Sequence, residues 1–218
     1  MRRDNQKNKD YVVKWSHGFT YAIGLLTTDG NLSKDGRHFD FTSKDIQLIR
    51  TFKVCLNLDC KISTKTNGHS DRKYYRVQFS NIRLYKYLLR IGLIPNKTKK
   101  IREIKVPKKY FFDFLRGHFD GDRSCFSFWD KRWPNSFMFY TYFTSSNLPH
   151  LEWLQNQINK LLNTTGSINK STRIWQLQYT KKDSQKLWKR MYYKKNLPCL
   201  LRKRKKVEKI LKIQAQVA

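Results

Sequence analysis

The sequence predicts a mixed α/β (α+β) fold made of two related halves, each with the order helix, hairpin, helix, hairpin, helix. Three observations predict it. A short signature occurs twice, as YAIGLLTTDG at 21–30 and as DFLRGHFDGDR at 113–123. The segments downstream of the two copies also correspond. Finally, apolar residues recur with helical and strand periods in the same order in both halves, which is typical of a structural repeat.

The two copies agree in detail, and so do the segments after them. In each signature a glycine lies five residues before an aspartate, Gly24 before Asp29 and Gly117 before Asp122. Further pairs of segments correspond downstream: FTSKD (41–45) with FTSSN (143–147), RVQFS (76–80) with QLQYT (176–180), and GLIPNK (92–97) with NLPCLLRK (196–203). The halves therefore share one plan.

The first helix and first hairpin of each half are predicted by periodicity. From Ser16 onward apolar residues recur at helical spacing, and the second half repeats the pattern; the residues are Phe19, Ala22, Ile23 and Leu26, then Phe111, Phe112, Leu115 and Phe119. After each signature aspartate the pattern changes to alternation, clearest over 38–42, where one face is apolar and the other polar. This predicts an antiparallel hairpin, entered through Gly30 in the first half.

The remaining elements are predicted in the same way. A second helix begins after Asp45, which is placed to cap it, and one stripe of each copy is apolar: Ile46, Ile49, Phe52 and Leu56, then Leu151, Leu154, Ile158 and Leu161. A second hairpin is expected at 61–80 and at 167–180. In the first half the closing helix ends at Gly92, before Pro95.

Composition shifts suggest how the chain is divided. We expect a basic flexible arm at 1–15, a first half at 16–95, a polar linker at 96–109 that contains Pro107, a second half at 110–200, and a basic C-terminal helix or tail at 201–218. Halves of about 90 residues bury limited surface alone, so the two halves are expected to share a core.

Charge and cysteine usage restrict the functional class. The 218 residues contain 46 Lys and Arg against 16 Asp and Glu, a formal net charge of +30. Such a chain suits a polyanion, most simply a nucleic acid, although charge alone also fits a basic ribosome-associated protein. The four cysteines are scattered, and no apolar run is long enough to span a membrane. We expect an intracellular protein of the cytoplasm, nucleoid or an organelle, neither secreted nor membrane-bound.

The segments AIGLLTTDG (22–30) and LRGHFDGDR (115–123) resemble the paired motifs of the LAGLIDADG homing endonucleases, in the single-chain form that carries both copies. The resemblance extends from about residue 16 to about 207. Thr27 stands where the family's first acidic residue is expected, and Arg123 replaces the final glycine. The resemblance implies a pseudo-twofold pair of α-β-β-α-β-β-α LAGLIDADG halves, whose antiparallel sheets form a DNA-binding saddle.

The resemblance also implies roles within the signatures. Gly24, Gly117 and Gly121 would let the two signature helices approach closely. Asp29 and Asp122 would then meet at the helix ends as catalytic metal ligands. Because two carboxylates at helix C-termini repel each other, a positive charge must hold them. The expected cofactor is Mg²⁺, as two or more divalent ions, with Mn²⁺ or Ca²⁺ able to occupy the same sites.

Further catalytic residues are implied after the last helix of each half. Lys97 matches the family's basic residue in the first half. In the second half the match is open between Arg202, Lys203 and Arg204, and Lys203 is favoured. These side chains would stabilise developing negative charge or polarise the attacking water. Ser43 and Ser145 stand where family members often have a polar residue that organises water.

The polar faces of the four hairpins are expected to contact DNA in the major groove, which admits a two-stranded ribbon. The expected residues are Asn31, Ser33, His38, Asp40, Tyr74, Arg76 and Gln78 in the first half, and Ser124, Tyr140, Tyr142, Gln176 and Gln178 in the second. Arg76 suits guanine, while Gln78 and Gln178 suit adenine. Basic residues near the hairpin tips would instead hold phosphates: Lys65, Lys131, Arg132, Lys170 and Arg173.

The predicted function is a monomeric, site-specific endonuclease that hydrolyses both strands of double-stranded DNA with divalent metal ions, encoded in an intron or by a free-standing gene. The alternative is a non-catalytic nucleic-acid binder on the same fold, either an intron RNA maturase or a transcription regulator. Arg123, beside Asp122, leaves two outcomes open. It contacts phosphate, or it crowds the metal site and leaves a nickase or an inactive binder.

Overall fold

The computed structural model describes residues 13–67, 70–122, 125–133 and 135–217. The first half contains α1 (His17–Thr28), β1 (Gly30–Leu32), β2 (His38–Ser43), α2 (Ile46–Leu56), β3 (Ser63–Asn67), β4 (Ser70–Ser80) and α3 (Ile82–Arg90). Two short 3-10 helices, η1 (Lys97–Lys99) and η2 (Lys108–Tyr110), lead to the second half. The second half contains α4 (Phe111–Gly121), β5 (Cys125–Trp129), β6 (Phe137–Ser145), α5 (Leu148–Leu162), β7 (Ser167–Lys170), β8 (Trp175–Tyr179), α6 (Lys181–Met191) and α7 (Leu201–Gln216).

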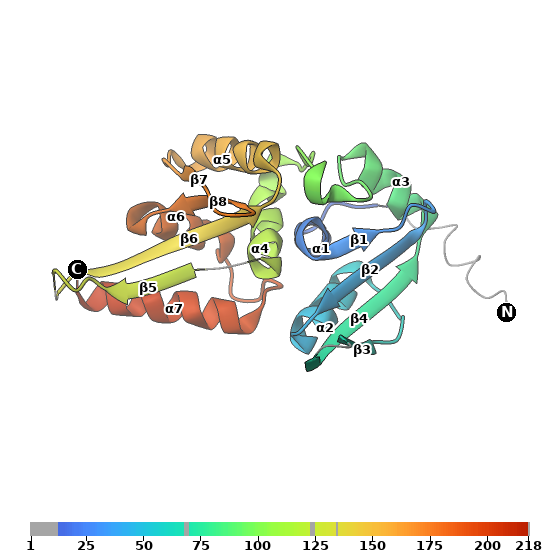
Figure 1. The fold of residues 1–218 in the computed structure, drawn as a ribbon, viewed down its shortest axis with the longest axis horizontal. Coiled ribbons are helices and arrows are strands. Elements are labelled where there is room, and N and C mark those ends of the chain that lie inside the picture. The colour runs from blue at the N-terminus through green and yellow to red at the C-terminus, as the bar shows by residue number, and fades with distance from the viewer. Residues whose placement is uncertain (1–12, 68–69, 123–124, 134, 218) are drawn as a thin grey trace.

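Each half forms a four-stranded antiparallel sheet with the same topology. The strand order is β1-β2-β4-β3 in the first sheet and β5-β6-β8-β7 in the second. The two sheets lie on either side of the central helices α1 and α4 (Figure 1). The fold class predicted from the repeat, a pseudo-twofold pair of α-β-β-α-β-β-α halves, is confirmed.

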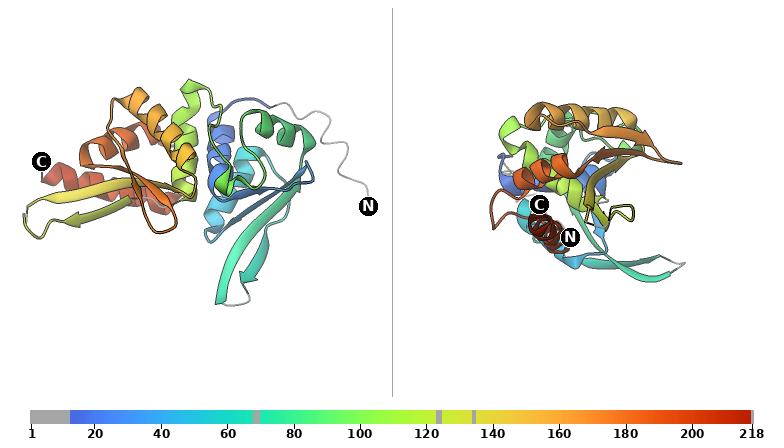
Figure 2. Two further views of the ribbon diagram at one scale, coloured as in Figure 1. Left: turned by 45° about the horizontal axis from the view of Figure 1, so that its top comes forward. Right: turned by 90° about the vertical axis from the view of Figure 1, so that its left-hand side faces the viewer.

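The alternation along each hairpin places one face of each sheet against helices and leaves the other uncovered. In β2 and β4 the side chains of Phe39, Phe41 and Val77 are buried, while those between them reach the surface. Helix α2 packs on β2 and β4, and helices α5 and α6 pack on the second sheet. Figure 2 shows the hairpins of both sheets projecting to the same side of the molecule.

The two signature helices touch through their backbones. A Cβ atom on Gly24 would lie 2.2 Å from the carbonyl oxygen of Phe114, and one on Gly117 would lie 2.1 Å from that of Tyr21. Any side chain at either position would therefore force the helices apart. Gly121 lies at the same contact, since its Cβ would meet the hydroxyl of Thr28.

Local capping explains where the helices begin. Ser16 caps α1 and accepts a hydrogen bond from the backbone N–H of Phe19 at 3.1 Å. Asp45 occupies the N-cap position of α2, but its side chain makes no capping hydrogen bond. Its carboxylate accepts hydrogen bonds from the guanidinium of Arg202 instead. The Asp45 carboxylate therefore links the first half to the C-terminal segment instead of capping α2.

The segments outside the two halves are partly packed on them. Residues 1–12 of the expected arm lie outside the described residues, whereas Trp15 stacks edge-on against Phe19 with ring centroids 5.7 Å apart. In the expected linker, Ile101 and Ile104 are buried. The basic C-terminal segment forms α7, which runs beneath β5 and β6 in Figure 1 and buries one apolar stripe. Within the described residues, no helix is both long enough and apolar enough to cross a membrane.

The helix contact gives a first prediction. Gly24→Ala should lower the free energy of unfolding by about 1 to 3 kcal/mol, because overpacking against the α4 backbone cannot be relieved by a side-chain movement. Gly18→Ala, in the same helix, is the matched control. Its Cβ would lie at an ordinary 3.5 Å from the Cys55 sulfur, so it should be neutral or stabilising by up to about 1 kcal/mol. Chemical denaturation measures both. Equal effects of the two substitutions would contradict the backbone contact.

Candidate active site

The last residues of the two central helices carry the signature carboxylates. Asp29 is the C-cap residue of α1 and Asp122 is that of α4. Because the helices are held together along the glycine contact, their C-terminal ends meet, and the two carboxylates repel each other strongly enough to change the pKa of Asp29. The predicted pair is thus brought together on the side where the hairpins project.

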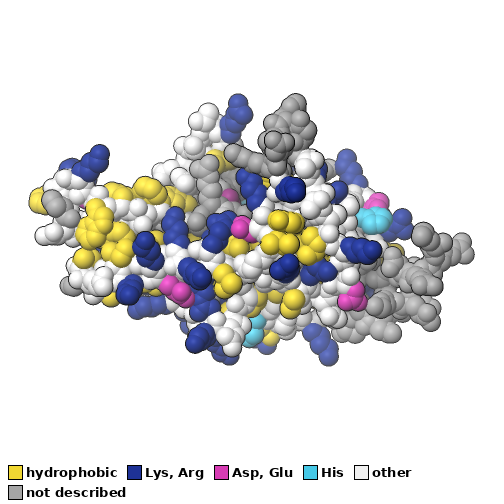
Figure 3. All heavy atoms as spheres, turned by 90° about the horizontal axis from the view of Figure 1, so that it is seen from below, with side chains coloured by type: hydrophobic (Ala, Val, Ile, Leu, Met, Phe, Trp, Pro, Cys, Tyr) yellow, Lys and Arg dark blue, Asp and Glu magenta, His cyan; other side chains and the backbone are white. Residues whose placement is uncertain are grey.

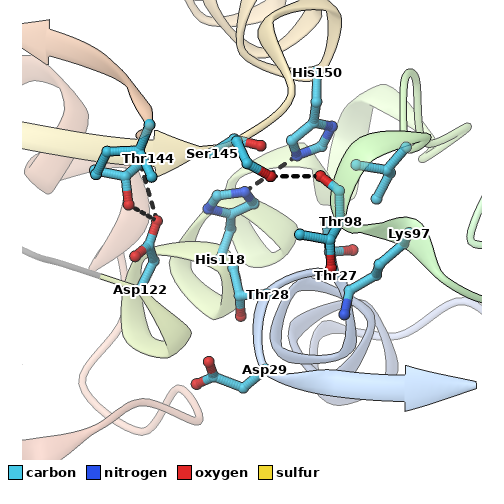
Figure 4. A pocket seen from close by; sticks show the side chains of 13 residues that line it. Thr27, Thr28, Asp29, Lys97, Thr98, His118, Asp122, Thr144, Ser145 and His150 are labelled. Atoms are coloured by element: carbon cyan, nitrogen blue, oxygen red, sulfur yellow. Dashed lines mark hydrogen bonds between the residues drawn. The ribbon is translucent and has the colours of Figure 1, made fainter. Parts of the chain in front are cut away.

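Two clefts flank this pair. One, of about 300 Å³, contains Lys97 and Ser145 beside the two aspartates (Figure 4). The other, of about 310 Å³, contains Lys203 and Ser43 beside the same aspartates. Each cleft therefore combines a lysine from one half with a serine from the other. The pseudo-twofold axis between α1 and α4 accounts for this exchange. Each lysine lies on the opposite side of the axis from the serine of its own half.

Asp122 is held in place by the neighbouring sheet. Its Oδ2 accepts hydrogen bonds from the backbone N–H of Thr144, at 2.9 Å, and from the hydroxyl of Thr144, at 2.5 Å (Figure 4). Sequence reasoning missed Thr144, although it lies within FTSSN, the segment that matches FTSKD. The matching Thr42 donates to Asp40 instead, at 3.0 Å. The two carboxylates are therefore supported differently.

Asp29 is less restrained. Its side chain reaches solvent at the mouth of the clefts, and none of the described residues donates a hydrogen bond to its carboxylate. Desolvation by the surrounding walls, followed by repulsion from Asp122, raises the pKa of Asp29 to about 7. Lys203 and Lys97 oppose this rise. A carboxylate pair with this repulsion favours a bound cation.

Lys97 and Lys203 each lie beside the C-terminal end of a signature helix. The ammonium of Lys97 donates to the carbonyl oxygen of Gly30, directly after Asp29. That of Lys203 donates to the carbonyl oxygens of Phe119, Asp120 and Asp122. Burial lowers the pKa of Lys97 to about 8, and burial also lowers the pKa of Lys203.

Of the three basic residues that the sequence left open for the second half, Lys203 is the one bonded to the end of α4, whereas Arg202 lines the same cleft without such a bond. Arg202 is paired with Asp45, and Arg204 with Glu208. The buried face of α7 explains the difference, because Lys203, Val207 and Ile210 lie on one stripe of the helix.

The donor set suits a hard divalent cation. Among the described residues no group of three or more His, Cys, Asp and Glu side chains is arranged to hold a metal. Two carboxylates with a substrate phosphate nearby form the usual oxygen set for Mg²⁺, which keeps several of its waters. Asp29 and Asp122 therefore fit such an ion in the presence of DNA.

Ser43 and Ser145 lie at the ends of the corresponding strands β2 and β6. The hydroxyl of Ser43 accepts from the backbone N–H of Asp45 at 3.2 Å, and that of Ser145 accepts from Asn147 at 3.0 Å. Both hydroxyls keep a proton free to donate to a water in the adjacent cleft. This geometry agrees with a water-organising position.

Two buried histidines line the Lys97 cleft and were not expected from the sequence. The Nε2 atoms of His118 and His150 lie 3.2 Å apart (Figure 4). Nδ1 of His150 donates to the carbonyl of Arg102 at 2.6 Å. Burial lowers the pKa of both rings. Both are therefore neutral, and they form part of the cleft wall. His118 occupies a signature position where the first copy has Leu25, which was the only available signal.

Asp120 has a structural role that its position in the signature did not predict. It is buried and accepts hydrogen bonds from the hydroxyl of Tyr21, at 2.8 Å, and from the backbone N–H of Leu200, at 2.7 Å. Burial raises the pKa of Asp120 to about 6. Since Tyr21 belongs to α1, this network ties the two central helices to the start of α7.

The expected DNA-contacting residues of the first sheet lie on its uncovered face. Asp40 accepts hydrogen bonds from the Arg76 guanidinium and, at 3.4 Å, from the amide of Gln78. His38 pairs with Asp35 in the preceding turn. The other expected residues of this face, Asn31, Ser33 and Tyr74, are exposed or half-buried. In the DNA-free protein, Arg76 is thus held by a neighbouring carboxylate.

The second sheet presents a different surface. Tyr140, Tyr142, Gln176 and Gln178 are half-buried on its uncovered face. Among the expected phosphate contacts, Arg132 pairs with Asp130, the ammonium of Lys170 lies over the Trp175 ring, and Lys131 and Arg173 are exposed. Phe126 and Phe128 also lie here, and sequence reasoning missed them. Ser124 and Arg123 lie outside the described residues.

No protein-family model matches this chain, and no curated protein sequence matches it either. Solved structures do. The homing endonuclease I-WcaI bound to its DNA recognition sequence is 14% identical, with a TM-score of 0.63 over 92% of this chain and 89% of that one. I-DmoI in complex with DNA and Mn is 19% identical, with a TM-score of 0.51 over 82% and 98% of the two chains.

A third similar structure is full-length DUF199/WhiA from Thermatoga maritima, 14% identical with a TM-score of 0.58. The match covers 95% of this chain and 63% of WhiA, so the chain spans less than two thirds of that protein. The N-terminal LAGLIDADG domain of WhiA also matches, over 90% of this chain. The protein therefore has the LAGLIDADG fold, which homing endonucleases and WhiA share.

The repulsion between the carboxylates gives a second prediction. A ¹³C NMR titration of side-chain carboxyls, without metal or DNA, should give Asp29 a pKa of about 7. In Asp122→Asn the pKa of Asp29 should fall, yet stay above its ordinary value, because desolvation remains. Asp35 is the internal control, since its hydrogen bond with His38 lowers its pKa to about 2. An ordinary pKa for Asp29 would contradict the arrangement.

The raised pKa of Asp29 also makes the stability of the protein depend on pH. The folded protein binds the Asp29 proton more tightly than the unfolded chain does, so this group stabilises the fold at low pH and the contribution is lost as the pH rises from about 4 through about 7. Without metal, Asp29→Asn should therefore be more stable than the parent at pH 8, with the difference shrinking towards pH 4. Thermal denaturation at several pH values measures it.

Proposed function

We propose that this protein is a site-specific DNA endonuclease that hydrolyses one phosphodiester bond on each strand of a double-stranded target with divalent metal ions. The observation that supports this most directly is the convergence of Asp29 and Asp122 between two clefts, each with its own lysine. Two related sites on one chain suit a duplex, whose strands are related by a local twofold axis. A single copy then suffices, so we propose a monomer.

The binding part of the proposal rests on shape and charge. The hairpins of both sheets project to the same side of the molecule, and the chain carries a net charge of +30. The I-WcaI and I-DmoI structures, which share the fold, contain target DNA. We propose that each sheet enters the major groove of one half-site and that the lysines and arginines at the hairpin tips hold phosphates.

The chemistry is set by the groups in each cleft. Divalent ions would activate a water and neutralise charge on the phosphate and the leaving oxygen; I-DmoI structures were solved with Mn and with Mg. Asp29 and Asp122 would hold these ions, and Thr144 keeps the carboxylate of Asp122 pointed into the site. Ser43 and Ser145 would orient the attacking water.

Lys97 and Lys203 would act beside the scissile phosphates. Each ammonium is fixed by backbone carbonyl oxygens close to a signature aspartate, so it loses little freedom when substrate arrives. The lowered pKa of Lys97, about 8, leaves part of the population neutral at mildly alkaline pH, where the amine can accept a proton from water. In its charged form the same group stabilises negative charge on phosphate.

The carboxylate pair gives a fourth prediction. A duplex should first be selected from a random pool by binding to the protein in EDTA and then tested for cleavage with Mg²⁺. Asp29→Asn and Asp122→Asn should each lower the cleavage rate by about 100-fold or more. Both should keep or raise DNA affinity, since each removes a negative charge near phosphates. Glu152→Gln, an exposed carboxylate on α5, is the matched control and should cleave at the parent rate.

The outcomes separate the two functions. Parental cleavage by either aspartate variant would contradict the roles assigned to Asp29 and Asp122. A selected duplex that the parent protein binds but never cuts would instead support a non-catalytic nucleic-acid binder. The fold is compatible with that alternative, because it is shared by homing endonucleases and by WhiA.

The Lys97 cleft gives a fifth prediction. Lys97→Met should reduce the single-turnover cleavage rate by about 100-fold, within the range that proton transfer by a positioned side chain contributes. Cleavage of one strand should be affected more than that of the other, because the second cleft keeps Lys203. Lys99→Met, an exposed lysine on the same 3-10 turn, is the control. Equal loss in both variants would indicate a general charge effect rather than a catalytic role.

A further inference from the structure

We propose that the second sheet reads an A·T-rich half-site, with Phe126, Phe128, Tyr140 and Tyr142 contacting thymine methyl groups in the major groove. We call these four side chains the aromatic face. This inference rests on the proposed function and deepens it: the target would consist of two chemically unequal halves, and the second sheet would read its half mainly by apolar contact.

The aromatic face is a continuous row on the uncovered side of β5 and β6. Phe126 is 54% exposed and Phe128 36% exposed. Ring centroids lie 5.6 Å apart for Phe126 and Phe128, 6.2 Å for Phe128 and Tyr140, and 6.1 Å for Tyr140 and Tyr142. Burial of these rings against a partner would remove a large apolar area from water. Such a row on an exposed strand pair therefore indicates a binding surface.

The first sheet lacks this surface at corresponding positions. The strands β2 and β6 end in the same segment FTS, at 41–43 and 143–145, so Tyr142 corresponds to Asp40 and Tyr140 to His38. Across the strand pair, Phe126 faces Tyr140, whereas Ser33 is the residue bonded to His38. Three charged or polar residues of the first half are thus replaced by aromatic ones. The two halves keep one fold but present different chemistry to DNA.

Thymine is the base that this surface fits. In the major groove adenine, guanine and cytosine present hydrogen-bonding groups, and only thymine adds a methyl group. A phenylalanine ring placed over a donor or acceptor of another base would remove its water without replacing the hydrogen bond, which is unfavourable. Over a thymine methyl the same ring gains apolar contact. Phe126 and Phe128 therefore discriminate in favour of thymine.

The neighbouring strand supports the same base pair. Gln178 pairs with Tyr142 in the sheet register, and Gln176 pairs with Thr144. Glutamine matches the N6 and N7 groups of adenine. The glutamines of β8 thus suit adenine edges. The aromatic face on the adjacent strands suits the methyl groups of the thymines paired with those adenines. Both sets of side chains favour A·T pairs.

Charge around the aromatic face indicates a nucleic acid rather than a second protein. Lys131 follows the end of β5, and Lys170 lies over Trp175 at the other edge of the sheet. Figure 3, which views the molecule from below, shows Lys and Arg side chains around the apolar surface of this half.

The test compares thymine with uracil, which lacks only the methyl group. A duplex is selected from a random pool by the full chain, and the half-sites are assigned with Gln78→Ala, which should relax base preference only under the first sheet. Replacing thymine by deoxyuridine in the A·T-rich half should weaken binding by about fourfold per contacted methyl. The same replacement in the other half should change affinity less than twofold.

A paired variant tests the residues. Phe126→Ser with Phe128→Ser should reduce affinity for the thymine duplex and remove most of the difference between the thymine and uracil duplexes. Val54→Ser, at an exposed apolar residue on α2, is the control and should leave that difference unchanged. Circular dichroism checks that the paired variant folds.

The outcomes distinguish this inference from the proposed function. A duplex that is bound and cut, yet insensitive to uracil in both halves, would overturn the thymine preference and leave the endonuclease standing. Preferential binding of the aromatic face to unpaired strands, or a change of oligomeric state in the paired variant, would also overturn it. Failure to select any duplex would overturn both proposals.

Discussion

The backbone contact between α1 and α4 is the constraint on which the rest of the structure depends. Gly24 and Gly117 bring the two helices closer than any side chain would allow. Because a helix is rigid over three turns, fixing its middle also fixes its end. The positions of Asp29 and Asp122 are therefore set by glycines one or more turns away. The two sheets, which follow these aspartates in the chain, lie on either side of the helix pair, and their hairpins project to the same side of the molecule.

The close approach of the two helices brings Asp29 and Asp122 together, which is electrostatically unfavourable. Two carboxylates at the negative ends of two helices destabilise each other, and the raised pKa of Asp29 is the visible result. Lys97 and Lys203 offset part of the repulsion at longer range. Each lysine ammonium is held mainly by backbone carbonyl oxygens rather than by a carboxylate. The two aspartates therefore remain available to a cation. Under the proposed function, a bound cation would relieve the repulsion that raises the pKa of Asp29.

The sequence was sufficient for the fold because periodicity and repetition act over whole elements. Ser16, the alternation over 38–42 and Gly92 each mark a boundary through local backbone chemistry, and duplication doubled every such signal. Side-chain partners were harder to predict. Asp45 was expected to cap α2 but bonds Arg202, which lies 157 residues further along the chain. Thr144, His118 and His150 join the cleft only because the chain folds back on itself. Such pairings depend on tertiary distances that no local pattern encodes.

The difference between the two sheets arises from the same constraint. The helices and the buried strand faces must match across the pseudo-twofold axis, because both pack on the shared α1 and α4 contact. The uncovered faces carry no such requirement. Asp40 and Tyr142 occupy corresponding positions with opposite chemistry, while Phe41 and Phe143, one residue further on, are both buried phenylalanines. A duplicated fold of this kind can therefore keep two equivalent helix ends while each sheet acquires a surface of its own, which is the property needed to recognise a target whose halves differ.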